Sequence, residues 1–329
     1  MLKKVILPLA FAAAFSAFPA LATTHSQAPA ASAAAAVVAA LPPLIDAQAL
    51  KAQLGRADLR ILDIRTGSDY AAGHIPGAIN TPYGTYRGPQ DNPGQLPAEA
   101  ALTELLQAAG VDAGTQVVVV HGGASHTDFG AAARVYWTLK VGGLTRLSIL
   151  DGGTKAWQAA GGALDSAAPA VARSRFNYRY DQAQIVSGDE LAAALEAGKA
   201  PALIDARPAK FYSGEVRVDA AARYGTLPGA RSLDNAQFFP EGGTTLKPAG
   251  ELKALVAQAG AADAPAVSFC NTGHWAATNW FVMSEIAGNK QVKLYPESVV
   301  GWSKSPLPME NEPSRVTALI QDVKRALDK

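Results

Sequence analysis

The chain of 329 residues has a single cysteine and almost no imbalance between positive and negative charges. One cysteine excludes a disulfide within one chain and any zinc site built from several cysteines. The 29 Lys and Arg residues against 28 Asp and Glu residues lack the positive excess typical of nucleic-acid-binding proteins. Charged residues make up only 17% of the chain and hydrophobic residues 49%, which excludes a disordered protein. The length instead predicts two globular domains of roughly 100–200 residues each.

The N-terminal region has a composition of its own. Lys3 and Lys4 precede an apolar run at 5–18, and small residues follow it, as in a secretory signal peptide. We therefore predict that residues 1–22 are removed, since the run is shorter than the ~20 residues of a membrane-spanning helix. Residues 23–43 are rich in Ala, Pro and Ser and are expected to form a flexible linker. With no lipid-anchoring cysteine next to the cleavage site, the product is expected to be periplasmic in a Gram-negative-type bacterium, with no membrane attachment.

Four short segments occur twice, in the same order and 142 to 152 positions apart, which indicates a duplicated domain. The pairs are Leu62–Arg65 with Ile204–Arg207, Gly73–Ala78 with Gly225–Ala230, Val118–His121 with Val267–Cys270, and Trp157 with Trp302. We expect one domain over 44–165 and a second over 179–308. A linker at 166–178 joins them, and a C-terminal helix is expected within 309–329.

Each copy alternates apolar runs typical of strands with stretches typical of helices. The expected strands are 59–64, 78–81, 116–120 and 147–150 in the first copy, and 202–205, 230–233, 266–269 and 292–295 in the second. The expected helices are 98–109, 129–140, one opening at the Ser187-x-x-Glu190 capping box, 251–259, 274–286 and 315–327. This alternation predicts an α/β fold in which each copy is a mostly parallel sheet flanked by helices.

Cys270 lies where a strand is expected to end and a helix to begin. The apolar run Ala266–Phe269 stops at the turn-forming residues Cys270–Gly273, and a helical stretch starts at His274. At such an edge, backbone N–H groups and the helix dipole favour a thiolate and hold an anion beside it. A lone thiol is also a liability in an oxidising compartment. We therefore favour a reactive nucleophile over a buried structural cysteine.

These motifs resemble the rhodanese superfamily, specifically the two-domain thiosulfate and 3-mercaptopyruvate sulfurtransferases. Asp63-Ile64-Arg65, Gly73–Ala78 and Leu150–Trp157 are similar to diagnostic segments of that family, and the resemblance covers roughly 44–308. It implies two tandem rhodanese-like domains with the active site between them. The first domain is then catalytically silent, because His121 stands in the cysteine position. No cofactor and no metal are expected.

The resemblance implies that Cys270 takes a sulfane sulfur and becomes a persulfide. The donor would be a small anion, thiosulfate or 3-mercaptopyruvate, and the acceptor cyanide, a thiol or a protein. The loop that cradles the persulfide would consist of Asn271, Thr272, Gly273, His274 and Trp275, with Gly273 at positive φ.

Three arginines are candidates for binding the anionic donor. Arg207 ends the second Asp-x-Arg segment, and Arg217 and Arg223 lie on the loop that follows. A guanidinium can form two parallel hydrogen bonds to a carboxylate or sulfonate. The alternative for Arg207 is a structural ion pair, as expected for Arg65 in the first copy.

The departures from the family pattern leave the donor open. Asn271 and Thr272 are neutral where thiosulfate-preferring relatives have basic residues, and Thr272 and Gly273 are closer to the mercaptopyruvate pattern. The segment 295–298 replaces an Asp-Gly-Ser-type turn, so the region behind the loop is expected to be reshaped.

Other functions are less well supported by the residues. A rhodanese-like phosphatase needs an arginine where Ala276 stands, and the histidines lack the spacing of metal ligands. The remaining alternative to an enzyme is a non-catalytic sulfur carrier that delivers a persulfide to a partner protein.

Overall fold

The computed structural model describes residues 1–10, 12, 14 and 39–327, and the chain divides into the units Met1–Ala39 and Ala40–Lys329. The expected cleavage site after residue 22 and most of the expected linker 23–43 lie outside the described residues. Residues 41–43 belong to the folded unit, because Leu41 N donates to Gln116 Oε1 and the Pro43 carbonyl accepts from Ile149 N. None of the described helices is long and apolar enough to cross a membrane.

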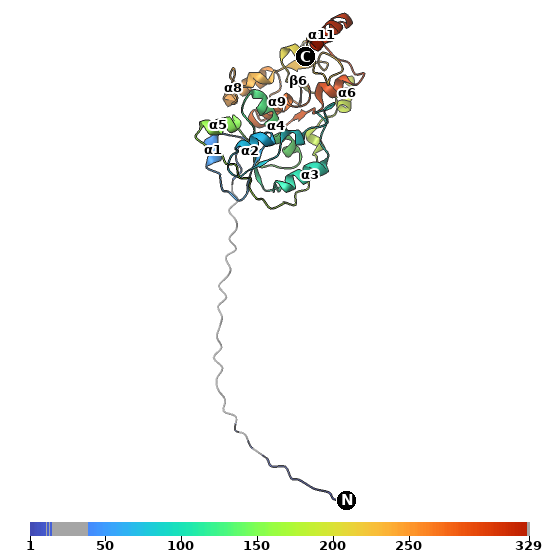
Figure 1. The fold of residues 1–329 in the computed structure, drawn as a ribbon. Coiled ribbons are helices and arrows are strands. Elements are labelled where there is room, and N and C mark those ends of the chain that lie inside the picture. The colour runs from blue at the N-terminus through green and yellow to red at the C-terminus, as the bar shows by residue number, and fades with distance from the viewer. Residues whose placement is uncertain (11, 13, 15–38, 328–329) are drawn as a thin grey trace. The chain divides into compact units, whose positions relative to one another are not determined.

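The first lobe is a five-stranded sheet in which every paired strand is parallel (Figure 1). Its order is β1-β5-β4-β2-β3, with β1 at Leu44–Ile45, β2 at Leu59–Asp63, β3 at Ala78–Asn80, β4 at Gln116–Val120 and β5 at Leu147–Leu150. The helices of this lobe are α1 (Ala47–Lys51), α2 (Gly67–Ala72), α3 (Glu99–Ala108), α4 (His126–Val141) and α5 (Gly153–Ala159), with the 3₁₀ turn η1 at Tyr83–Tyr86. All five residues of β4 are buried, as expected for a central strand covered on both faces.

The second lobe repeats this arrangement with four strands, again all parallel. The order is β7-β6-β8-β9, with β6 at Ala202–Asp205, β7 at Arg231–Ser232, β8 at Ala266–Phe269 and β9 at Val292–Leu294. Its helices are α6 (Gly188–Glu196), α7 (Ala209–Tyr212), α8 (Ala249–Gln258), α9 (Trp275–Phe281), α10 (Ser298–Ser303) and α11 (Arg315–Leu327), with the 3₁₀ turns η2 (Gln182–Gln184) and η3 (Asn235–Phe238). A parallel bridge between Ile185 and Leu294 stands where β1 pairs with β5 in the first lobe.

The structure confirms the predicted α/β fold, with local differences. The strand expected at 230–233 forms only over the two residues of β7. It lies at the edge of the sheet, where β6 is its only neighbour among the described strands. The helix expected at 274–286 is α9 followed by a π-helical turn, η4, at Val282–Ile286. The capping box at Ser187 and Glu190 is present, and α11 forms where the terminal helix was predicted. The two-residue strand β1 is too short to give a sequence signal.

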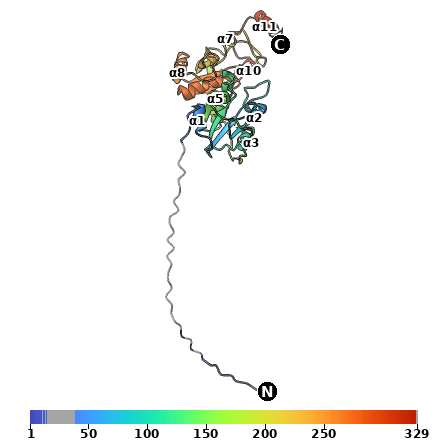
Figure 2. The same cartoon turned by 60° about the vertical axis from the view of Figure 1, so that its left-hand side comes forward.

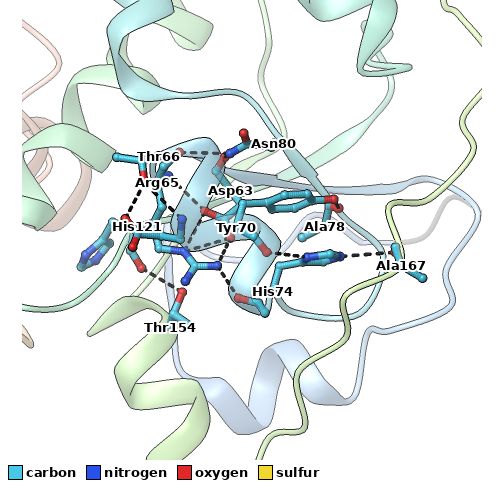
Figure 3. Close-up of polar contacts among 12 residues, drawn as sticks. Asp63, Arg65, Thr66, Tyr70, His74, Ala78, Asn80, His121, Thr154 and Ala167 are labelled. Atoms are coloured by element: carbon cyan, nitrogen blue, oxygen red, sulfur yellow. Dashed lines mark hydrogen bonds and ion pairs between the residues drawn. The ribbon is translucent and has the colours of Figure 1, made fainter.

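Hydrogen bonds repeat between the lobes and confirm the duplication. Arg65 Nη2 donates to the Gly73 carbonyl in the first lobe (Figure 3), and Arg207 Nη2 donates to the Gly225 carbonyl in the second. The indole nitrogens of Trp157 and Trp302 likewise each donate to a carbonyl six residues further on. The same short segments therefore make the same local structure twice.

The helices α4 and α9 lie side by side between the two lobes (Figures 1 and 2). Phe129 and Tyr136 of α4 meet Phe281 of α9 edge to face, with ring centroids 5.6 and 5.1 Å apart. Lys140 on α4 pairs with Glu285 across the contact at 2.9 Å. Apolar burial and edge-to-face contacts of this kind fix one lobe against the other.

Candidate active site

Cys270 directly follows β8 and opens onto a pocket between the lobes. The pocket volume is about 280 Å³, and Cys270 itself is only 1% exposed. The lining residues come from both lobes: Pro93, Thr127, Val218, Ala220, Cys270, Asn271, Thr272, His274 and Trp275. The edge at the carboxyl ends of parallel strands is where α/β proteins commonly bind ligands. The structure thus brings the predicted nucleophile and most of its predicted loop together at the lobe interface.

The loop after Cys270 is held by hydrogen bonds to Ser298, a residue for which the sequence predicts no supporting role. Ser298 Oγ accepts hydrogen bonds from Cys270 N at 3.0 Å and Gly273 N at 3.1 Å, and donates to the Tyr295 carbonyl at 2.9 Å. Ser298 has a φ of +53°, and the corresponding residue of the first lobe, Gly153, has +61°. Ser298 thus occupies a left-handed position that the first lobe gives to glycine. Ser298 lies in the segment 295–298, for which the sequence predicts a reshaped turn.

The loop itself leaves several amides free. Gly273 has a φ of +70°, as predicted, and a Cβ there would lie 2.5 Å from the Pro296 carbonyl oxygen. Within the described part of the chain, nothing accepts a hydrogen bond from the amides of Asn271, Thr272 or His274. Free backbone N–H groups gathered in one turn are suited to holding an anion.

Two arginines of the first lobe bind carbonyl groups of this loop. Arg87 Nη2 donates to the Thr272 carbonyl at 2.9 Å, and Arg134 Nη1 donates to the Gly273 carbonyl at 3.3 Å. Burial, together with the like charge of Arg87, lowers the pKa of Arg134 to about 10, so it remains a cation at neutral pH. Neither arginine carries a sequence signal, because 185 and 139 positions separate them from the carbonyls they bind.

His274 anchors the loop to the first lobe. Its Nε2 lies 2.9 Å from the Thr127 carbonyl, which only accepts, so Nε2 carries the proton. Nδ1 is then an acceptor, and Tyr83 OH donates to it at 2.7 Å. Burial, followed by the charge of Arg87, lowers the pKa of His274 to about 3. The imidazole is therefore neutral and fully engaged, while Trp275 Nε1 donates to Thr127 Oγ1 beside it.

Arg207 forms the ion pair that was the alternative to donor binding. It is 1% exposed, its Nε and Nη2 donate to both carboxylate oxygens of Asp205, and Asp205 has no exposure. Arg65 and Asp63 make the same pair in the first lobe (Figure 3). Arg207 still reaches the loop, because its Nη1 donates to Asn271 Oδ1 at 3.3 Å.

The other two candidate arginines have partners elsewhere. Arg217 donates to the Ala221 carbonyl and to Asp322 of α11. Arg223 donates to three backbone carbonyls in the segment 303–307. Neither is among the residues that line the pocket over Cys270, although Val218 and Ala220 from the same loop are.

The equivalent position of the first lobe is a buried histidine. His121 is 1% exposed, and both its ring nitrogens lack a partner among the described residues. Burial lowers its pKa to about 4, so it is neutral near pH 7. In the loop after His121, Asp128 Oδ2 accepts from Ala124 N at 2.7 Å, a side-chain contact that the Cys270 loop lacks because Ala277 stands in the position of Asp128.

Comparison with known proteins agrees with this geometry. The model of the rhodanese-like domain matches residues 46–160 and again 187–305. A thiosulfate sulfurtransferase of Azotobacter vinelandii is 31% identical over 274 residues, which cover 82% of this chain and 96% of the relative. The 3-mercaptopyruvate sulfurtransferase of Escherichia coli K12 is 27% identical, with 77% and 92% covered.

Solved structures give the same result. The rhodanese-fold enzyme SseA of Escherichia coli superposes with a TM-score of 0.68 at 25% identity, covering 78% of this chain and 99% of that one. An anaerobic ergothioneine biosynthesis enzyme of Chlorobium limicola has a TM-score of 0.69 at 20% identity, covering 82% and 70%, and shares the fold. With two matched domains along nearly the whole folded unit, the chain belongs to the rhodanese family of sulfurtransferases.

Proposed function

We propose that Cys270 is the residue that carries sulfur, passing it from a small anionic donor to a thiophilic acceptor. The observation that carries this proposal is the placement of the only thiol of the chain. It lies at the carboxyl end of β8, beside the free amides of its loop, in a pocket that both lobes line.

With thiosulfate, the Cys270 thiolate attacks the outer sulfur. A bond forms between Sγ and that sulfur, the S–S bond of the donor breaks, and sulfite leaves with the bonding electron pair. Cyanide or a thiolate acceptor then attacks the terminal sulfur of the persulfide, forming thiocyanate or a new persulfide and returning the Cys270 thiolate. With 3-mercaptopyruvate, a bond forms between Sγ and the thiol sulfur, and the C–S bond of the donor breaks with its electron pair going to the enolate of pyruvate. The proton of the donor thiol is released as the persulfide anion forms, and the enolate carbon takes up one proton, so no net proton is consumed.

The loop supports this chemistry without a general base. An anionic persulfide is stabilised by fixed N–H dipoles, and the free amides of Asn271, Thr272 and His274 are available to it. His274 is unsuited to moving protons near pH 7, since its ring nitrogens are both engaged and its pKa is lowered to about 3. We propose that the loop residues 271–275 act through their backbone, and that Arg207 acts on the donor through Asn271.

Donor preference remains between thiosulfate and 3-mercaptopyruvate, and relatives of both names match the chain. We propose a small acceptor as well, since a pocket of about 280 Å³ around a thiol with 1% exposure suits cyanide or a low-molecular-weight thiol. A carrier that delivers sulfur only to a partner protein would need a more exposed cysteine. Multiple turnovers of thiosulfate or 3-mercaptopyruvate with cyanide support the enzyme, and a stable persulfide that no small acceptor discharges supports the carrier.

The decisive experiment follows the sulfur on the protein. Incubation with a competent donor is expected to add one sulfur, about 32 Da, to the intact mass, and cyanide is expected to remove it. Cys270→Ser is the control, since a serine hydroxyl is similar in size and stays protonated. Absence of the added mass in the wild type with both donors, or its presence in Cys270→Ser, would overturn the assignment.

We propose further that the protein acts in the periplasm after removal of residues 1–22, and that its domains are those expected from the repeat. The support is the charged, apolar and small-residue pattern of the N-terminus. N-terminal sequencing of the protein from its natural cell tests this. A mature chain that begins at Thr23 agrees with the proposal, and one that keeps Met1 contradicts it.

A further inference from the structure

Two cations of the first lobe contact the Cys270 loop without a carboxylate partner, Arg134 fully buried and Arg87 half-buried. Arg134 has no exposure, and its contacts are the carbonyls of Gly273 and Gly94 and the ring of Trp137, 5.1 Å away. Arg87 binds the Thr272 carbonyl and lies 5.4 Å over the Tyr83 ring. No ion pair to either is found in the part of the chain that the structure describes. Buried charges are normally compensated, so the fully buried Arg134 together with the half-buried Arg87 favours an anion in this site.

We infer that Arg87 and Arg134 are positioning residues for sulfur transfer: the silent lobe uses them to orient the Cys270 loop and to give its pocket a positive potential that selects anionic substrates. This inference rests on the proposed function and names the source of its anion specificity. It assigns to the first lobe a part in the reaction, although that lobe has no nucleophile.

The orienting effect follows from the planarity of the peptide unit. In a trans peptide, the C=O and the following N–H point in opposite directions. Arg87 holds the Thr272 carbonyl while Ser298 holds the Gly273 amide, so this peptide is fixed at both ends. Arg134 holds the Gly273 carbonyl, which turns the free amide of His274 away from Arg134. The loop is thus oriented by groups on two lobes.

The electrostatic effect follows from the neighbouring groups. Arg207 is matched by Asp205, His274 is neutral, and burial raises the pKa of Tyr83, which keeps that phenol neutral as well. The nearby carboxylate of Glu297 accepts from Asn92 Nδ2. Arg87 and Arg134 are therefore the cations that directly bind the loop without a matching acid, and charges act more strongly where water is excluded.

Two alkylating probes of similar size separate charge from reactivity. Iodoacetate is an anion and iodoacetamide is neutral, and both react with the Cys270 thiolate. The ratio of their rate constants therefore cancels any change in thiolate fraction or access, and reports the potential at the sulfur. We expect Arg87→Gln and Arg134→Gln each to lower the iodoacetate to iodoacetamide ratio about 3- to 10-fold. Arg87→Lys is expected to keep most of the ratio, since it keeps the charge.

Arg231→Gln is the matched control. Arg231 also donates to a backbone carbonyl of the second lobe, that of Ala259, but it is exposed and lies on β7. The ratio is expected to stay at the wild-type value in this variant. An unchanged ratio in both Arg87→Gln and Arg134→Gln, or an equal fall in Arg231→Gln, would overturn the inference. If Arg134→Gln does not fold, Arg87→Gln compared with Arg87→Lys decides alone.

The alkylation-rate ratio is measured independently of the persulfide experiment. Alkylation needs no donor or acceptor, so a failed inference leaves the persulfide experiment untouched, and a failed persulfide experiment leaves the ratio measurable. A second measurement joins the two. If the positive potential selects donors, Arg87→Gln is expected to raise the KM for the anionic donor several-fold, and Arg87→Lys is expected to restore the wild-type KM. If Arg87 instead acts by orienting the loop, both Arg87→Gln and Arg87→Lys are expected to lower kcat.

Discussion

The two lobes have the same chain path and differ in what fills the turn after the central strand. In the first lobe, His121 stands at the strand end and Asp128 accepts from the amide of Ala124 within the loop. In the second, Cys270 and Ala277 occupy these two positions, 149 residues on, and Ser298 holds the loop from behind. The lobes therefore share a fold but differ in the residue at the strand end, in Asp128 and in Ser298. We attribute the proposed sulfur chemistry of the second lobe to these differences.

The two lobes contribute different groups to the site at their interface. The second lobe supplies the thiol and the amides. The first supplies Arg87, Arg134, Tyr83 and the Thr127 carbonyl, all of which bind the loop of the other lobe. The first lobe, which has His121 in the position of Cys270, thus lines the pocket and holds the loop of the second lobe.

The strongest test of this contrast moves the thiol to the other lobe. In a Cys270→Ser background, His121→Cys is expected to take up no sulfur, because Asp128 occupies the loop and no serine supports it from behind. Adding Asp128→Ala is expected to give a slow, measurable uptake. Intact-mass analysis after incubation with thiosulfate reads both variants. Full uptake by His121→Cys alone would show that the shared fold is sufficient.

The matched Asp-x-Arg pairs allow a comparison of stability. Arg207→Ala leaves Asp205 buried without its partner, and is expected to lower the free energy of unfolding by about 3–5 kcal/mol. Arg65→Ala is expected to cost less, since the Arg65 side chain is 14% exposed and water can replace it in part. Urea unfolding measures both. A stable Arg207→Ala variant that has lost donor binding would instead favour direct substrate contact by Arg207.

Ser298 and Gly153 offer a smaller test at matching backbone positions. Ser298→Gly keeps the left-handed backbone but removes the acceptor of two buried amides, so we expect a loss of about 1–3 kcal/mol in stability and roughly 10-fold in kcat. Ser298→Ala keeps the Cβ at positive φ, and with it the strain that glycine relieves, so it is expected to be less stable than Ser298→Gly. Thermal unfolding and cyanide turnover decide, and an active, stable Ser298→Ala variant would contradict a supporting role.

The smallest expected effect concerns acid. His121 has a pKa of about 4 when folded and about 6.5 when unfolded, so the unfolded chain binds a proton that the folded chain does not. Its contribution to stability is present above pH 6.5 and is lost as the pH falls toward 4. Between pH 7 and 5.5 the loss is about 1 kcal/mol. His121→Gln is expected to flatten this dependence in unfolding experiments, and an unchanged slope would show that His121 is protonated in the folded protein.

The sequence was sufficient for the features that depend on local pattern. Alternating apolar runs predict the strands within a residue or two, and the repeated segments predict the duplication. Cys270 was identifiable because a strand, a turn and a helix follow one another around it. Gly273 was predicted at positive φ and has it.

The rest of the site depends on packing between distant segments. Arg134 of α4 meets the loop because α4 packs against α9, and Arg87, which follows η1, reaches the loop from a segment 185 positions away. No sequence pattern near either residue predicts these contacts. Ser298 sits where a glycine is expected, so its sequence context suggested a reshaped turn rather than a support. Arg217 and Arg223 were placed near the site by analogy, and the fold turns their guanidinium groups toward carbonyls and Asp322.

The aromatic contact between α4 and α9 also limits how far the protein can be shortened. A fragment that begins at the second lobe would expose Trp280 and Phe281, which are at most 1% exposed in the whole chain. Such a patch favours self-association, and the fragment would also lack the arginines that bind its loop. A single-domain version of the second lobe would thus require polar residues on the exposed face of α9 and another source of positive charge beside its loop.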